Sequence, residues 1–150
     1  MKEPFSEKTL VLERVFSASP ERVFEAFSSA EAMSQWFGPV GCQVLNAQVD
    51  FRVGGDYHLR ITTEDGGEIS LVGTYDHIEK PKYLSFSWRW VYNPDFNPCD
   101  SFVNITFQEH GDGTLLRLVQ TGIDDDTDRN MHVMGWSSTF EKLALLFPQN

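Results

Sequence analysis

The chain has 150 residues and a formal net charge of −10, with 41% hydrophobic and 13% aromatic residues. This length predicts one domain over residues 1–150, with a core of about 9–147 that is large enough to bury a sizeable apolar interior. The acidity disfavours nucleic acid and anionic membrane surfaces as partners, because both attract proteins largely through Lys and Arg. No apolar run could span a membrane and no signal-peptide pattern begins the chain, so we expect a cytoplasmic protein without stable membrane insertion.

The titratable residues form no recognisable metal or redox motif. Cys42 and Cys99 are far apart, and none of the histidines lies in an HxH, HExxH or close Cys/His pattern. The acidic run 124–128 lacks the alternating ligands and distal Glu of a calcium loop. We therefore predict no metal, no cofactor and no catalytic residue. Whether the two cysteines form a disulfide stays open.

The N-terminal part of the chain predicts a strand followed by two short helices. Residues 9–16 are rich in β-branched and apolar side chains, which is typical of a strand. Ser19 and Pro20 are typical of a helix N-terminus. Ser28 and Glu31 have the spacing of a capping box, which predicts the start of a second helix.

Residues 42–122 predict a run of strands separated by Gly-Gly, Asp-Gly and Pro-rich turns. Short links between consecutive strands indicate an antiparallel meander. The last predicted element is a long helix that begins at the acidic run 124–128, where the helix dipole favours negative charge. Its apolar stripe must be buried against the sheet and consists of Trp136, Phe140, Leu143 and Phe147.

The adjacent glycines Gly54 and Gly55 raise the question of a phosphate-binding loop. Such a loop joins a strand to a helix, so that backbone N–H groups and the helix dipole meet the anion. Here the glycines lead from one predicted strand to the next, with no GxGxxG pattern around them. We therefore interpret them as residues that bend the sheet.

An aromatic strand supplies the strongest indication of a binding site. Phe86, Trp88 and Trp90 alternate with polar residues and share one face of the predicted strand 83–92. This face either packs as ordinary core under the last helix or forms the wall of an aromatic pocket. His132 lies one helical turn before Trp136 and is either a buried core histidine or a group facing the same interior.

With its elements in this order, the chain resembles the START-like, helix-grip (SRPBCC) superfamily. Within it, the chain is similar to the group related to the C-terminal domain of the activator of heat-shock protein 90 ATPase. The stretches that carry the resemblance include "VFSASPERVFEAFSSAEAMSQWFGP", "VDFRVGGDY", "GTYDHIEKPKYLSFSW" and "MGWSSTFEKL". The resemblance implies an α+β fold in which an antiparallel six- or seven-stranded sheet wraps around a long C-terminal helix. Two short helices follow the first strand.

The resemblance also implies a cavity between sheet and C-terminal helix that takes a lipid, polyketide, sterol or other apolar small molecule. By position, the side chains expected to line it are Trp36, Phe51, Tyr57, Leu59, Tyr75, Phe86, Trp88, Trp90, His132, Trp136 and Phe140.

Three function classes follow. The leading hypothesis is a non-enzymatic binder of a hydrophobic molecule. The second is a polyketide cyclase or hydratase-type enzyme, in which His132 or Tyr75 serves as the acid–base group. The third is an interaction module like the chaperone-ATPase activators, with a chaperone partner and a role in the stress response. The activator relatives carry an additional N-terminal domain. The exposed side of the first strand, together with Phe37 and Val53, leaves room for a homodimer.

Overall fold

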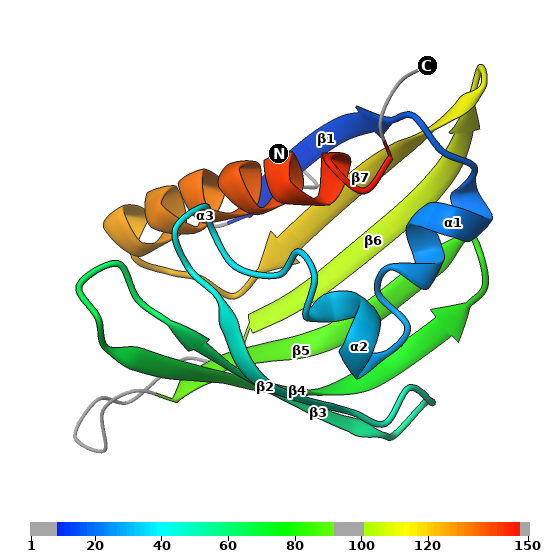
Figure 1. The fold of residues 1–150 in the computed structure, drawn as a ribbon. Helices are drawn as coiled ribbons and strands as arrows, with labels where there is room; N and C mark the ends of the chain where they lie inside the picture. The colour runs from blue at the N-terminus through cyan, green and yellow to red at the C-terminus, as the bar shows by residue number, and fades with distance from the viewer. Residues whose placement is uncertain (1–8, 92–100, 148–150) are drawn as a thin grey trace, which may run out of the picture.

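The computed structural model describes residues 9–91 and 101–147, which form a seven-stranded antiparallel sheet and three helices (Figure 1). The elements in chain order are β1 (Leu10–Phe16), α1 (Pro20–Glu25), α2 (Ala30–Met33), β2 (Val44–Val49), β3 (Asp56–Thr62), β4 (Glu68–Glu79), β5 (Tyr83–Val91), β6 (Ser101–His110), β7 (Gly113–Thr121) and α3 (Asp126–Ala144). The predicted α+β helix-grip fold is confirmed, with seven strands.

The sheet is a meander from β2 to β7 that β1 completes at one edge. Its strand order is β1-β7-β6-β5-β4-β3-β2. The first strand therefore pairs with the last, from Leu10 opposite Gln120 to Phe16 opposite Thr114. Figure 1 shows the curved sheet with α3 lying across one of its faces and α1 and α2 on the same side. The sheet, α3 and the segment that joins α2 to β2 thus surround a common interior.

The Gly54–Gly55 pair connects β2 to β3, and β4 holds its backbone. The N–H of Gly54 donates to the carbonyl oxygen of Tyr75 at 2.8 Å, and the N–H of Tyr75 donates to Gly55 at 2.9 Å. These bonds lie beside an irregularity in the β4–β5 register, between Tyr75 and His77. Gly54 has φ +85°, which other residues rarely adopt. The two glycines therefore form a bend that is hydrogen-bonded to the sheet, as the sequence predicts.

The two short helices begin at serine N-caps, one of which differs from the prediction. The Oγ of Ser19 accepts from the N–H of Arg22 at 3.4 Å, as expected. At α2 the N-cap is Ser29, whose backbone is extended and whose Oγ accepts from the N–H of Ala32 at 3.1 Å. The capping box predicted at Ser28 is wrong, because the Ser28 hydroxyl donates to the carbonyl oxygen of Glu25 and completes the end of α1.

Helix α3 begins at Asp125, whose carboxylate accepts from the N–H of Asp128 at 2.8 Å. Its predicted apolar stripe is buried, including Phe147 just beyond the last helical residue. The Phe16 ring on β1 contacts Phe140 and Phe147 edge-on, with centroids 5.9 Å and 6.2 Å away. These contacts fix the C-terminal half of α3 on the sheet. In the described part of the chain, no helix combines the length and apolarity needed to cross a membrane.

Candidate functional site

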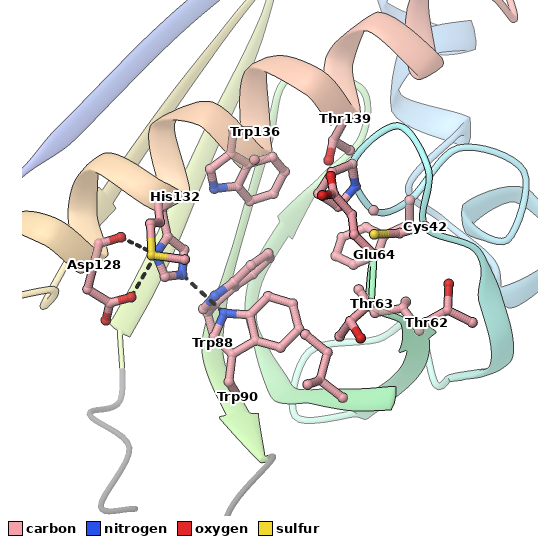
Figure 2. Close-up of a pocket in the computed structure, with 17 residues that line it drawn as sticks. Cys42, Thr62, Thr63, Glu64, Trp88, Trp90, Asp128, His132, Trp136 and Thr139 are labelled. Atoms are coloured by element: carbon pink, nitrogen blue, oxygen red, sulfur yellow. Dashed lines mark hydrogen bonds and ion pairs between the residues drawn. The ribbon is translucent and has the colours of Figure 1, made fainter. Parts of the chain in front are cut away.

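A cavity of about 550 Å³ opens beside the N-terminal half of α3 (Figure 2). Four parts of the chain form its walls: α3, the aromatic end of β5, the β3–β4 hairpin and the segment 37–42. The residues from α3 and β5 are Trp88, Trp90, Asp128, Met131, His132, Gly135, Trp136 and Thr139. The residues from the other two walls are Phe37, Gly38, Pro39, Cys42, Ile61, Thr62, Thr63, Glu64 and Ile69.

The segment 37–42 is held against α3 by side chains of that helix. The N–H of Val40 donates to the Oγ of Ser138 at 2.8 Å. The Nζ of Lys142 donates to the carbonyl oxygens of Phe37 and Cys42 at 3.3 Å and 3.0 Å. Desolvation lowers the pKa of Lys142, although the nearby Cys42 opposes this shift. The ammonium group thus acts as a clamp that fixes one wall of the cavity.

Cys42 is buried on this wall, and its chemistry follows from its surroundings. Burial raises the pKa of the thiol, and the Glu64 carboxylate raises it further, while Lys142 lowers it. A thiol with a raised pKa is a poor nucleophile near neutral pH. Cys99, which the sequence left open as a disulfide partner, lies outside the described residues.

The aromatic wall is a packed group of tryptophans. The rings of Trp88 and Trp136 lie 4.9 Å apart and tilted by 39°. Trp90 stands at 89° to Trp88, with centroids 5.5 Å apart. The indole Nε1 of Trp88 is buried and has no hydrogen-bond partner among the described residues. The two indoles on β5 therefore present π faces in perpendicular directions.

A buried polar chain fixes the orientation of Trp136. Its Nε1 donates to the Oε1 of Gln120 at 2.8 Å. The Nε2 of Gln120 donates to the Oγ of Ser101 at 3.0 Å, and that hydroxyl donates to the carbonyl oxygen of Trp88 at 3.1 Å. Gln120 is fully buried. This chain links α3, β7, β6 and β5 behind the aromatic wall.

Both ring nitrogens of His132 are engaged. The indole Nε1 of Trp90 donates to Nε2 at 3.1 Å, and Nδ1 lies 2.8 Å from the backbone oxygen of Asp128. Since an indole N–H is only a donor, Nε2 must be the acceptor and the ring proton must sit on Nδ1. Figure 2 shows His132 between Asp128 and the tryptophans. The carboxylate of Asp128 also lies 3.6 Å from Nδ1. In this arrangement His132 orients Trp90, and neither nitrogen is free to take a proton from a ligand.

Among the described residues, no group of three or more His, Cys, Asp or Glu side chains could hold a metal ion.

Solved structures of similar proteins cover nearly the whole chain. Protein CV1439 from Chromobacterium violaceum is 31% identical, with a TM-score of 0.83 over 95% of this chain and 99% of that one. The AHSA1 protein SPO3351 from Silicibacter pomeroyi is 28% identical, with a TM-score of 0.79 over 91% and 95% of the two chains. Protein Mll3558 from Rhizobium loti is 28% identical, with a TM-score of 0.73 over 91% and 94%. No curated protein sequence matches the chain.

A family model described as Activator of Hsp90 ATPase homolog 1-like protein matches residues 17–147. The chain belongs to this AHSA1-like family. The match and the folds of the solved relatives confirm the predicted START-like, helix-grip superfamily.

The side chains predicted to line a cavity in this AHSA1-like chain fall into three groups. The first lies on the wall of the 550 Å³ cavity and consists of Trp88, Trp90, His132 and Trp136. The second surrounds only a void of about 10 Å³, roughly the space of one water, and consists of Trp36, Tyr57, Leu59, Tyr75 and Phe86. Trp88 and Trp136 border this void as well as the cavity. Phe51 and Phe140 line neither space.

The second group is filled by its own packing. Trp36 is fully buried, donates its Nε1 proton to the carbonyl oxygen of Ala26 at 2.9 Å and contacts Phe27 at 4.7 Å between centroids. The hydroxyl of Tyr57 donates to the carbonyl oxygen of Ser87 at 2.6 Å. The tyrosines Tyr57 and Tyr75 contact each other at 5.5 Å. Little room remains for a ligand in this half of the interior.

Sequence reasoning missed two of the four walls. The β3–β4 hairpin contributes Ile61, Glu64 and Ile69, and the segment 37–42 contributes Pro39 and others. The turn-forming "EDGGE" predicted the hairpin, but nothing local in the sequence indicates that it lies next to α3. Thr139 was also missed, although it follows Trp136 by one turn and shares its face.

Two buried tyrosines should make stability fall at alkaline pH. Burial raises the pKa of the Tyr57 and Tyr75 phenols, and for Tyr57 the neighbouring Tyr75 adds to the rise. Below about pH 10 both the folded and the unfolded chain keep these protons, so the phenols cause no pH dependence there. Above it the unfolded chain releases protons that the folded chain retains, and the free energy of unfolding falls by up to about 1.4 kcal/mol per tyrosine and pH unit.

Urea unfolding at about pH 9 and pH 11 would measure this loss. Tyr75→Phe should lose less stability between the two pH values than the parent chain, because one of the two phenols is gone. Tyr83→Phe is the control, since Tyr83 is only partly buried and donates to Asn104 on the outer face. Equal losses in the parent and Tyr75→Phe would contradict the assignment.

Proposed function

We propose that this AHSA1-like protein binds a small, largely apolar molecule in the cavity beside α3. The observation that carries the proposal is a 550 Å³ space whose walls include Trp88, Trp90 and Trp136. Ligand sites typically have volumes of about 300–1,000 Å³ and mainly hydrophobic, aromatic linings with a few polar groups. The family fold agrees with this use, and lipids, polyketides, sterols and aromatic molecules are the classes to test.

The packing behind the walls supports the proposal. Trp136 is held by Gln120, Trp90 is held by His132, and the segment 37–42 is held by Lys142. Each of these bonds fixes a wall in place without occupying the cavity. A preorganised site of this kind loses little conformational entropy when a ligand enters.

A cyclase or hydratase-type activity is less well supported than binding. His132 has both nitrogens engaged, and Tyr75 lies around the small void rather than on the cavity wall. A homodimer, a chaperone partner, a stress-response role and a cytoplasmic location stay predictions. Of the two residues suggested for a dimer contact, Phe37 is buried, whereas Val53 is 60% exposed.

A thermal-shift screen with fatty alcohols, fatty amines, sterols, flavonoids and aromatic polyketides tests the proposal. A ligand at a hundred times its dissociation constant adds about 2.7 kcal/mol of stability. For a chain of this size, the melting temperature should rise by roughly 5–10 °C. The cavity-filling variant Ile69→Trp should abolish the rise, because Ile69 is half-buried on the cavity wall.

Ile78→Trp is the matched control. Ile78 is also a half-buried isoleucine on β4, but it does not line the cavity, so its variant should keep the ligand-dependent rise. Ligand shifts that survive in Ile69→Trp would place binding elsewhere. A screen without any shift across all these classes would contradict the proposed function.

A further inference from the structure

The charged groups on the cavity wall are all acidic. Glu64 and Asp128 line the cavity, and no Lys or Arg does so among the residues that the structure describes. Glu64 is exposed on the β3–β4 hairpin, and the Asp128 side chain is 47% exposed on the first turn of α3. The whole chain carries a formal charge of −10. A ligand that enters this cavity therefore meets a negative potential.

Among the described residues, three nearby groups could offer positive charge, and each has a partner. Arg129 on α3 binds the carbonyl oxygen of Ile123 and the carboxylate of Asp126 and does not line the cavity. The Nζ of Lys142 binds the carbonyl oxygens of Phe37 and Cys42 and stands behind the wall that these residues form. His132 accepts from Trp90 at Nε2, and its Nδ1 lies 2.8 Å from the backbone oxygen and 3.6 Å from the carboxylate of Asp128. In the described part of the chain, a ligand carboxylate therefore finds no Lys or Arg on the cavity wall.

The positive end of the α3 dipole does not reverse the negative potential of the cavity. A helix start is equivalent to about half a positive charge, which by itself attracts anions. Here the side chains of Asp125, Asp126 and Asp128 surround it. Arg129 pairs with Asp126, and Asp125 caps the N–H of Asp128, so the carboxylates of Asp125 and Asp128 face the half charge of the helix. The carboxylates outweigh the dipole at this end of the cavity.

The tryptophans supply a favourable surface for a cation. Indole is the aromatic side chain that attracts cations most strongly, and desolvated contacts within about 6 Å of the ring are the most favourable. Trp88 and Trp90 stand at 89° to each other, and Trp136 packs on Trp88 from α3. Asp128 lies on the same side of the cavity, bound through its backbone to the His132 ring that holds Trp90 (Figure 2).

We propose that the cavity selects lipophilic cations: an apolar body with a quaternary ammonium or protonated amine that sits against the tryptophans near Asp128. This inference rests on the proposed function and narrows it. Fatty-acid-like carboxylates of the same length are rejected, because their charge meets Glu64 and Asp128 without a compensating base.

Three probes with the same ten-carbon chain test the inference: decyltrimethylammonium, decanol and decanoate. Each is titrated at neutral pH and low salt, below its micelle-forming concentration, with tryptophan emission as the readout and calorimetry as the check. Decyltrimethylammonium should bind about tenfold more tightly than decanol, which lacks the cation–π attraction. Decanoate should bind more weakly than either. Added salt should narrow these differences, because it screens exposed charges.

Single charge-removing variants locate the effect. Glu64→Gln and Asp128→Asn should each lower the affinity for decyltrimethylammonium about two- to fivefold, in line with partly exposed ion pairs. The affinity for decanol should not change. Glu109→Gln is the matched control, since it removes the same charge from an exposed residue of β6 that does not line the cavity. Equal weakening by Glu109→Gln would overturn the local role of Glu64.

The outcomes separate this inference from the proposed function. Decanol or decanoate binding as tightly as the cation, with the binding lost in Ile69→Trp, would overturn the cation preference and leave the binding function intact. Binding of none of the three probes would overturn the inference, while the ligand screen described above decides the function separately.

Discussion

Replacing Trp136 by Phe will destabilise the protein by about 3 kcal/mol, roughly twice the loss caused by Trp88→Phe. The two rings form a matched pair, because they pack on each other and are 4% and 5% exposed. Both substitutions remove the same atoms from the same aromatic wall. They differ in the hydrogen bond: Trp136 donates to Gln120, whereas the Trp88 nitrogen has no partner among the described residues.

The two stability losses differ because Trp136→Phe leaves a buried polar atom without its hydrogen-bond partner. Trp136→Phe leaves the Oε1 of fully buried Gln120 without a donor, and an unsatisfied buried polar group costs about 1–3 kcal/mol. Trp88→Phe loses packing only. Urea unfolding of both variants measures the two losses. The double variant Trp136→Phe/Gln120→Met should recover part of the stability, because it removes both members of the bond. Equal losses for the two single variants would contradict this account.

Gln120 also shows what the sequence could not predict at the site. Residues 114, 116, 118 and 120 share the inner face of β7, so period-two alternation places a glutamine among core leucines. Such a buried amide needs partners, but they come from β6 and α3, at Ser101 and Trp136. The pairing of strands and the position of the helix determine these hydrogen bonds, and the local sequence pattern predicts neither.

The fold itself was predictable because its signals are local. Turn dipeptides separate the strands, serine and aspartate mark the helix starts, and alternation identifies the inner face of β5. Alternation predicts the face but not the position along it. Phe86, Trp88 and Trp90 share that face, yet Phe86 borders only the filled half of the interior, Trp88 borders both spaces, and Trp90 borders only the cavity. The positions of α3 and the segment 37–42 over the sheet decide which of these residues line the cavity.

The close packing at Gly73 also depends on neighbouring strands that the local sequence does not predict. This position should tolerate no side chain. A Cβ at this position would lie 2.1 Å from the carbonyl oxygen of Ser87 on β5 and 2.5 Å from the Tyr57 ring on β3. Tyr57 is opposite Gly73 in the β3–β4 register and donates its hydroxyl proton to the same Ser87 oxygen. Gly73→Ala should therefore destabilise the protein by about 3 kcal/mol, at the upper end of overpacking losses.

Gly135→Ala is the control for Gly73→Ala, because the two variants add the same methyl group in opposite environments. Among the described residues, a Cβ at Gly135 would meet only the Pro39 side chain, at 4.0 Å, so the added methyl group has room there. This variant should be neutral or gain up to about 1 kcal/mol from helix propensity. Urea unfolding and the near-ultraviolet circular dichroism of the tyrosines report both effects. A Gly73→Ala protein within about 0.5 kcal/mol of the parent would show that β4 and β5 can separate freely at this point, contrary to the close packing of Tyr57 over the glycine.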